Sequence, residues 1–256
     1  MSFATFELRG QVGILSLNRP DRLNAISSDM LDDLHAAFDE AEVCGEATTL
    51  VLTGVGRAFC AGEDLKEFDD LAADSSRAQA HIASIQMVSR RIMTGNRIVV
   101  AAARGYAVGG GFEWLLNCDL AVAGTDLVAF LPELQLGQFP TGGLTYLLPR
   151  TIGHKRTMQM LALGERFGGD QMLERGLVNW VVEPDDVLGR AVTVAQRIAE
   201  QTNPDSTARF KQMLRHEPGS IDEALDLEEE ATFESFMRLA TGGSKPTNPR
   251  NSGEKS

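Results

Sequence analysis

The sequence, 256 residues long, lacks the features that mark secreted and membrane proteins. Its first residues, MSFATFELRGQVG, contain no basic segment followed by an apolar run, so we expect no signal peptide. No apolar run approaches the roughly 18 residues that a transmembrane helix needs, so we expect no membrane-spanning segment and no membrane partner.

Cysteine is scarce, since only Cys44, Cys60 and Cys118 are present. This odd count, without a CxxC pattern or Cys/His ligand spacing, argues against a disulfide framework and against a metal site. The four histidines join no HExxH pattern, and no GxSxG nucleophile elbow occurs. We therefore expect a cytoplasmic protein in a reducing compartment, whose cysteines are small core or surface residues.

Positive charge is also in short supply. The chain has 24 Lys and Arg against 36 Asp and Glu, which gives a formal net charge of −12. Such an acidic chain is a poor partner for nucleic acids and anionic membranes. Any anionic ligand must therefore be held by local donors rather than by the overall field of the protein.

What is present is an alternation of short apolar runs with helical patterns. Strands are expected at residues 12–17, 49–52, 98–103, 120–123 and 128–131. One helix is expected after Ser27 or Ser28, which can cap it, another at 79–93, and a short one through Leu115, Leu116 and Cys118. Strands that alternate with helices predict an α/β architecture with buried parallel strands.

The last part of the chain has a different pattern. Helices are expected at 187–200, 205–215 and 221–239, separated by Asn203-Pro204 and Pro218-Gly219, and we interpret them as a helical appendage. The tail after residue 240 is polar and expected to be frayed. The last helix has an apolar face that is consistent with a subunit interface, made of Ile221, Leu225, Leu227, Phe233, Phe236 and Met237.

Three consecutive glycines, Gly109 to Gly111, follow the strand at 98–103 in the segment GYAVGGGFEW. A P-loop is excluded because Gly111-Phe112 stands in place of its Lys and Ser/Thr, and a GxGxxG fingerprint fails at Trp114. Two interpretations stay open: a tight strand-to-helix turn, or bare backbone amides at a helix start that bind a developing oxyanion. The second needs another donor, for which the loop AFCAGEDL at 58–65 is the candidate, unless it is only a surface loop.

Two acids lie near these loops. Glu113 follows the glycines among apolar neighbours, where burial raises the pKa of a carboxyl group and suits it to proton transfer. Glu133 follows Pro132 at the end of an apolar run, and for this residue taken alone ordinary helix-start chemistry is the favoured interpretation.

Four motifs in order carry a resemblance to a known family: LNRPDRLNAI, AFCAGEDL, GYAVGGGFEWLLNCDLAVA and FLPELQLGQFPTGG. The sequence resembles the crotonase superfamily, the enoyl-CoA hydratase/isomerase group, over about residues 12–182. This resemblance implies an α/β fold made of a right-handed, crotonase-like spiral of ββα turns at residues 1–190. Residues 191–256 would then be a C-terminal helical oligomerisation region with a frayed tail. Homotrimers, often paired into hexamers as dimers of trimers, would be expected.

The resemblance also implies roles for individual residues. The backbone N–H groups of Glu63 and Gly110 would form the oxyanion hole, and Glu113 and Glu133 would be the catalytic acids. The matching candidates for contacts to coenzyme A are Arg22, Leu23, Asp64, Leu65 and Lys66. No metal and no separate cofactor would be needed, because coenzyme A is part of the acyl-CoA thioester substrate.

The implied reaction is the addition of water to a 2-enoyl-CoA, as in fatty acid metabolism. Glu113 would activate the water and Glu133 would deliver a proton to C2. The alternatives are another acyl-CoA reaction, by an isomerase, hydrolase, decarboxylase or lyase, and a non-enzymatic binding module, although the net charge opposes RNA. Thr141, Phe112 and Trp114 depart from common family patterns, and we expect Trp114 to pack behind its helix rather than line the acyl site.

Overall fold

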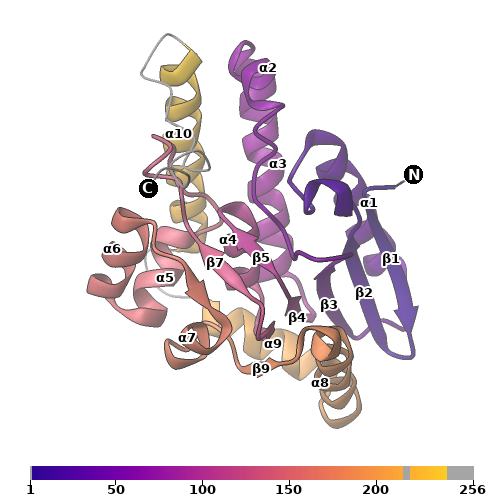
Figure 1. The fold of residues 1–256 in the computed structure, drawn as a ribbon. Helices are drawn as coiled ribbons and strands as arrows, with labels where there is room; N and C mark the ends of the chain where they lie inside the picture. Colours follow the sequence, from indigo (N-terminus) through magenta and orange to yellow (C-terminus); the bar gives the residue numbers. More distant parts are fainter. Residues whose placement is uncertain (1, 216–219, 241–256) are drawn as a thin grey trace.

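A six-stranded sheet and a three-stranded sheet organise the fold (Figure 1). The computed structural model describes residues 2–215 and 220–240. The larger sheet has the order β1-β2-β3-β4-β6-β9, with β1 antiparallel to β2 and every other neighbouring pair parallel. Its strands are Ala4–Arg9, Val12–Leu17, Thr49–Gly54, Ile98–Ala103, Leu120–Gly124 and Trp180–Val182.

The smaller sheet gives the fold its repeating turn. It consists of β5 (Tyr106–Val108), β7 (Val128–Phe130) and β8 (Phe167–Gly168), in that order. From β4 to β7 the chain alternates between the two sheets, and helix α4 (Gly110–Asn117) lies between β5 and β6. Strand, strand and helix therefore repeat as the chain advances, which is the expected ββα spiral.

Both faces of the larger sheet are buried, because side chains alternate along each strand. On one face, Leu15, Leu52 and Val99 join the main core with helices α1 (Ser28–Val43) and α3 (Ser75–Thr94). On the other face, Ile14, Val51 and Val100 pack against helix α8 (Val187–Gln201). Near-continuous apolar runs such as VGILSL follow from this double burial, as is typical of parallel strands.

Helix α8 spans residue 190, where the sequence predicts the boundary between the spiral core and the helical region. Val187, Ala191 and Ala195 are buried against the sheet, so residue 190 lies within a helix that covers one face of the core. The two helices that follow α8 are α9 (Pro204–Arg215), which contacts β4, and α10 (Ile221–Ala240).

Shorter elements complete the fold. The remaining helices of the described residues are η1 (Pro20–Arg22), α2 (Phe68–Ala72), α5 (Leu144–Ile152), α6 (His154–Leu163), α7 (Gly169–Glu174) and η2 (Pro184–Asp186). None of the helices in the part of the chain that the structure describes is long and apolar enough to cross a membrane.

The expected elements are all found, with small shifts of their ends. The strands at 12–17 and 98–103 have the expected bounds, and Ser27 caps α1 by accepting a hydrogen bond from the N–H of Met30. The helix-start interpretation of Glu133 is wrong. The chain makes a turn there, in which the carbonyl of Glu133 accepts hydrogen bonds from the N–H groups of Leu136 and Gln138.

Helix α10 runs beside α3, and part of its apolar face packs against other elements of the same chain (Figure 1). Ile221 and Leu225 are buried in a cluster with Met93, and Phe233 packs on the cluster that contains Leu71. The side chains of Leu227 and Phe236, and the tail after residue 240, lie outside the described residues.

Candidate active site

The two loops singled out in the sequence lie side by side. The N–H of Cys60 donates to the carbonyl of Tyr106 at 2.9 Å, and the N–H of Val108 donates to the carbonyl of Cys60 at 3.0 Å. On its other side the loop pairs with Ile26, whose N–H donates to the carbonyl of Gly62 at 2.8 Å. The segment that carries Glu63 is therefore held next to the strand that leads into Gly109 and Gly110.

Glycine is required where these backbones meet. A Cβ on Gly62, which has φ +81°, would lie 2.7 Å from the carbonyl oxygen of Val108. A Cβ on Gly111 would lie 2.3 Å from the carbonyl oxygen of Cys60. Real Cβ atoms do not approach backbone oxygens this closely, so only glycine permits this contact between the loops.

Two backbone amides in these loops have no backbone acceptor. Gly110 is the first residue of α4, and its N–H therefore has no partner within the helix. In the other loop, the N–H groups of Ala61 and Asp64 donate to backbone carbonyls, whereas that of Glu63 donates to no described residue. These are the two amides that the resemblance assigned to an oxyanion hole, and the structure brings their segments together.

The side chain of Glu133, from the turn after β7, lies beside the N-terminal end of α4. Gly109, the N-cap of that helix, has φ 52° and ψ −124°, and a Cβ there would lie 2.7 Å from Oε1 of Glu133. The carboxyl group is buried, and its Oε2 accepts no hydrogen bond from any residue that the structure describes. A buried polar atom without a partner is costly, which favours a bound group that can satisfy it.

Glu113 is held by a loop from elsewhere in the chain. It lies in the first turn of α4 and is 1% exposed. The N–H of Thr141 donates to its Oε1 at 2.8 Å, and the hydroxyl of Thr141 donates to its Oε2 at 2.6 Å. In the sequence Thr141 stands out only as a departure from family patterns, and nothing local to it signals its contact with Glu113.

The environments of the two acids differ. Burial raises the pKa of Glu113 to about 7, with a further contribution from the charge of Glu63, although the two bonds from Thr141 favour the charged form. Burial, followed by the charge of Glu113, raises the pKa of Glu133 well above its ordinary value. The pair therefore favours one ionised and one protonated carboxyl group over two ionised ones, and the two hydrogen bonds from Thr141 favour Glu113 as the ionised one.

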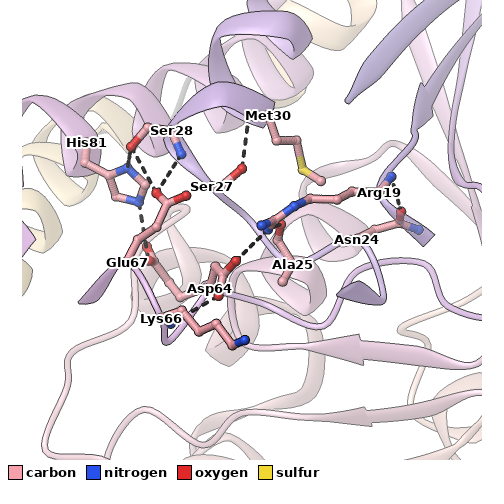
Figure 2. A network of polar contacts seen from close by, with 11 residues as sticks. Arg19, Asn24, Ala25, Ser27, Ser28, Met30, Asp64, Lys66, Glu67 and His81 are labelled. Carbon is pink, nitrogen blue, oxygen red and sulfur yellow. Dashed lines mark hydrogen bonds and ion pairs between the residues drawn. The ribbon is translucent and has the colours of Figure 1, made fainter. Parts of the chain in front are cut away.

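The predicted coenzyme A contacts fall into two groups. Arg22, Leu65 and Lys66 are exposed, and Leu23 is partly buried in the left-handed region with φ 54°. Asp64 is buried, and its Oδ2 accepts a hydrogen bond of 2.6 Å from Arg19 (Figure 2). Asp64 therefore braces the loop through its side chain, together with the Lys66 N–H that donates to its Oδ1.

A buried asparagine joins two of the motifs, and sequence reasoning missed it. Oδ1 of Asn24 accepts from the N–H of Arg19 at 2.8 Å, and its Nδ2 donates to the carbonyl of Ala58 at 2.8 Å. The LNRPDRLNAI segment is thereby tied to the AFCAGEDL segment. The only signal in the sequence that the two segments meet is the order in which the two motifs occur.

Other candidates play no chemical role. Phe112 and Trp114 are fully buried in the main core, so Trp114 packs behind its helix as expected. Burial raises the pKa of Cys60 to about 12, which keeps its thiol protonated and unreactive. Among the described residues, no group of three or more His, Cys, Asp or Glu side chains could hold a metal ion.

Comparison with known proteins identifies the family. The model of the family Enoyl-CoA hydratase/isomerase matches residues 7–241. The chain is 34% identical to the mevalonyl-coenzyme A hydratase sidH of Aspergillus fumigatus over 213 residues, 82% of this chain and 78% of the relative. It is 33% identical to the short-chain-enoyl-CoA hydratase of Clostridium acetobutylicum over 232 residues, 90% of this chain and 88% of the relative.

Solved structures agree with this assignment. An enoyl-CoA hydratase/isomerase from Mycobacterium paratuberculosis superposes with a TM-score of 0.84 at 26% identity, covering 94% of this chain and 96% of the other. Enoyl-CoA hydratase subunit I from Geobacillus kaustophilus superposes with a TM-score of 0.75 at 33% identity, covering 93% and 88%. With the spiral fold and the paired loops already described, the chain belongs to the enoyl-CoA hydratase/isomerase family of the crotonase superfamily.

Proposed function

We propose that the protein is an enoyl-CoA hydratase that adds water across the 2,3 double bond of a 2-enoyl-CoA thioester. The observation that supports this most is the pair of buried glutamates, Glu113 and Glu133, in environments that separate their protonation states. Two carboxyl groups whose surroundings push their pKa values apart are suited to act as base and acid in one reaction.

The contacts favour particular roles. Glu113 accepts two hydrogen bonds from Thr141, which stabilise its charged form, so it acts as the base that takes a proton from water as the oxygen attacks C3. Glu133 is buried and has an unpartnered Oε2, so it acts as the acid that protonates C2. The C3–O and C2–H bonds form while the π bond between C2 and C3 is lost, and the water supplies both added groups overall.

The negative charge that develops on the thioester oxygen would rest on the amides of Glu63 and Gly110. Both amides lack a backbone acceptor among the described residues, and their loops are fixed against each other by the glycine contacts. Fixed donors stabilise an enolate without rearranging during the reaction. Arg22, exposed at the end of η1, and Lys66, exposed just after the Glu63 loop, would supply local positive charge for the phosphates of coenzyme A.

The names of the relatives support hydration but leave the acyl group open. One is a mevalonyl-coenzyme A hydratase and another a short-chain-enoyl-CoA hydratase. The test is a panel of 2-enoyl-CoA thioesters of increasing length, followed by loss of the conjugated thioester absorbance and by the mass gained from one water. Failure to hydrate any member of the panel would contradict the proposal.

A double-bond isomerase is the second candidate, because both oxygens of Glu113 are already engaged by Thr141 and only Glu133 has a free one. The variant Glu113→Gln separates the two. A hydratase that loses its base should slow by about 10²- to 10⁴-fold, whereas an isomerase that uses Glu133 alone should lose little. Both activities are measured on the same preparation, with 2-enoyl- and 3-enoyl-CoA of equal length.

A further inference from the structure

A third carboxylate belongs to the candidate site. Glu63 contributes the backbone amide of the proposed oxyanion hole, and its side chain is 31% exposed rather than buried. Its charge is felt by Glu113, since it contributes to the raised pKa of that residue. An acyl group whose carbonyl oxygen is bound by the amide of residue 63 starts at the same residue that carries this carboxylate.

A buried histidine holds the Glu63 side chain in place. His81 on α3 is 5% exposed, and its Nε2 lies 3.3 Å from Oε2 of Glu63. Burial alone would lower the pKa of His81, but the hydrogen bond and charge of Glu63, with the charge of Glu67, outweigh it and raise the pKa. The raised pKa extends the imidazolium form, which has two N–H donors, to higher pH than in a free histidine.

The opposite nitrogen of His81 is also engaged. Nδ1 lies 3.2 Å from the hydroxyl of Ser28, and both the hydroxyl and the N–H of Ser28 donate to Oε2 of Glu67, at 3.2 and 3.1 Å (Figure 2). The ring thus lies between Glu63 and Ser28, and Ser28 is held in turn by Glu67. Its position, and with it that of Oε2 of Glu63, is defined by contacts with α1, α3 and the loop.

One carboxylate oxygen of Glu63 has no hydrogen-bond partner among the described residues. Oε2 faces His81, whereas Oε1 accepts no hydrogen bond from any residue that the structure describes. A purely alkyl acyl group would strip water from this charged oxygen without replacing its hydrogen bonds, which is unfavourable. A hydroxyl group on the acyl chain would replace them. A cationic group is not required, because His81 already contacts Oε2 of Glu63.

We propose that Glu63 and His81 form a specificity site for an acyl group that carries a hydroxyl on the carbons beyond the double bond, with the hydroxyl donating to Oε1 of Glu63. This inference rests on the proposed hydratase function and names its substrate class. The Glu63 side chain is a positioning and recognition group in this role, distinct from its backbone amide.

The test compares substrates of equal length. The kcat/KM of the full-length protein is measured for hydration of 2-pentenoyl-CoA and of its 4-hydroxy and 5-hydroxy derivatives. We expect at least one hydroxylated substrate to be preferred by about tenfold or more, because a site built to bind a hydroxyl discriminates strongly against analogues without it. A preference for the alkyl substrate in the wild-type protein would overturn the inference, with or without any variant.

Variants assign the preference to residue 63. In Glu63→Leu the ratio of kcat/KM for hydroxylated over alkyl substrate should fall by at least about tenfold, mainly through KM. The variant Asp39→Asn is the matched control, because it too removes a carboxylate that is paired with a side chain of α3, in this case Arg91. Its ratio of kcat/KM for hydroxylated over alkyl substrate should stay as in the wild type. Equal losses on both substrates in Glu63→Leu would mean that the side chain only supports the loop, and would overturn the inference.

The two failures can be told apart. If the wild-type protein hydrates all three substrates without a preference, the specificity inference fails and the hydratase proposal stands. If it hydrates none of them, and no other 2-enoyl-CoA either, the proposed function itself fails.

Discussion

Thr141 shows how one residue can set the chemistry of another. It gives Glu113 two hydrogen bonds, one from its backbone and one from its hydroxyl, on opposite oxygens of the carboxylate. Burial pulls the pKa of Glu113 upward, and these bonds limit the rise. The side chain of Thr141 therefore helps to keep the proposed base ionised near neutral pH.

Replacing Thr141 by Val should shift the pH dependence of activity. Loss of a hydrogen bond to a charged group costs about 1.5–3 kcal/mol, which corresponds to about one to two pKa units. The pKa of Glu113 rises, so a smaller fraction is ionised at pH 7 and the acidic limb of the kcat/KM profile moves to higher pH. The profile is measured with the best enoyl-CoA substrate.

Thr141→Ser is the matched control, because it keeps the hydroxyl and should leave the acidic limb near its wild-type position. The interpretation would be contradicted by a Val variant that loses activity equally at every pH. Such a result would indicate a displaced loop rather than a shifted pKa.

At the scale of elements, helix α3 links the C-terminal helix to the site. Gln86 is 1% exposed, and its Nε2 donates to the carbonyl of Leu225 in α10 at 2.7 Å. Its Oε1 accepts from the N–H of Gly142 at 2.9 Å, in the residue next to Thr141. One buried amide therefore connects the docking of α10 with the loop that holds Glu113.

Replacing Gln86 by Leu should lower kcat more than it changes KM. The change leaves the Gly142 N–H buried without its partner, at a cost of about 1–3 kcal/mol, whereas the Leu225 carbonyl, inside α10, loses only its second hydrogen bond. The loop then holds Glu113 less firmly, while the exposed loop residues proposed to contact coenzyme A are untouched. Steady-state kinetics and chemical denaturation measure the two effects on the same variant.

Arg90→Ala is the control for this prediction. Arg90 joins the same two helices through ion pairs with Asp222 and Asp226, but at the exposed edge and away from Gly142. Exposed pairs contribute about 0–1 kcal/mol, so stability should change slightly and kcat should not. If both variants reduced kcat equally, the loss would come from weaker packing of α10 on α3 in general. The specific contact of Gln86 with Gly142 would then not explain it.

At the scale of the whole molecule, buried acids make stability depend on pH. Glu113 has a pKa of about 7 in the folded protein, against an ordinary value of 4.5. The folded state therefore binds this proton more tightly than the unfolded state, and the contribution of Glu113 to folding stability falls as pH rises from about 4.5 to about 7 and then levels off. The penalty at higher pH is of the order of 3 kcal/mol.

Glu113→Gln should remove that penalty. The amide oxygen can still accept the N–H of Thr141, and no buried charge remains at this position. The variant should be more stable than the wild type at pH 8, by up to about 3 kcal/mol, and nearly equal to it at pH 4. Urea denaturation at both values measures the difference.

Asp39→Asn is again a suitable control, since Asp39 is 62% exposed. Surface changes of this kind alter stability by about 0.5 kcal/mol or less, with no such growth with pH. A stability difference for Glu113→Gln that is the same at pH 4 and pH 8 would show that the carboxyl group is not buried in the state that unfolds.

The sequence was a good guide wherever the information is local. Runs such as VGILSL identify strands because both faces of a parallel sheet are apolar, and Ser27 identifies a helix start because its side chain can cap the helix. Very short strands were missed, among them β5, which has three residues and no period long enough to recognise. The antiparallel edge strand β1 was missed as well, although the alternation of apolar and polar residues along it is the pattern of a half-buried strand.

The residues that bear the chemistry followed a similar division. The glycine loops and the two glutamates could be named from motif order, because glycine is needed where backbones touch and an acid among apolar neighbours is unusual. The turn at Glu133 could not be distinguished from a helix start, because Pro followed by Glu is common to both.

By itself, therefore, the sequence determined the α/β class, the spiral and the pair of acids at the glycine loops. Only the tertiary structure decided the contacts around the site: Thr141 with Glu113, His81 with Glu63, and Gln86 with both Leu225 and Gly142. These partners are 18 to 139 residues apart in the chain. No local period or propensity relates such positions, and their contact exists only once the sheets and helices have packed.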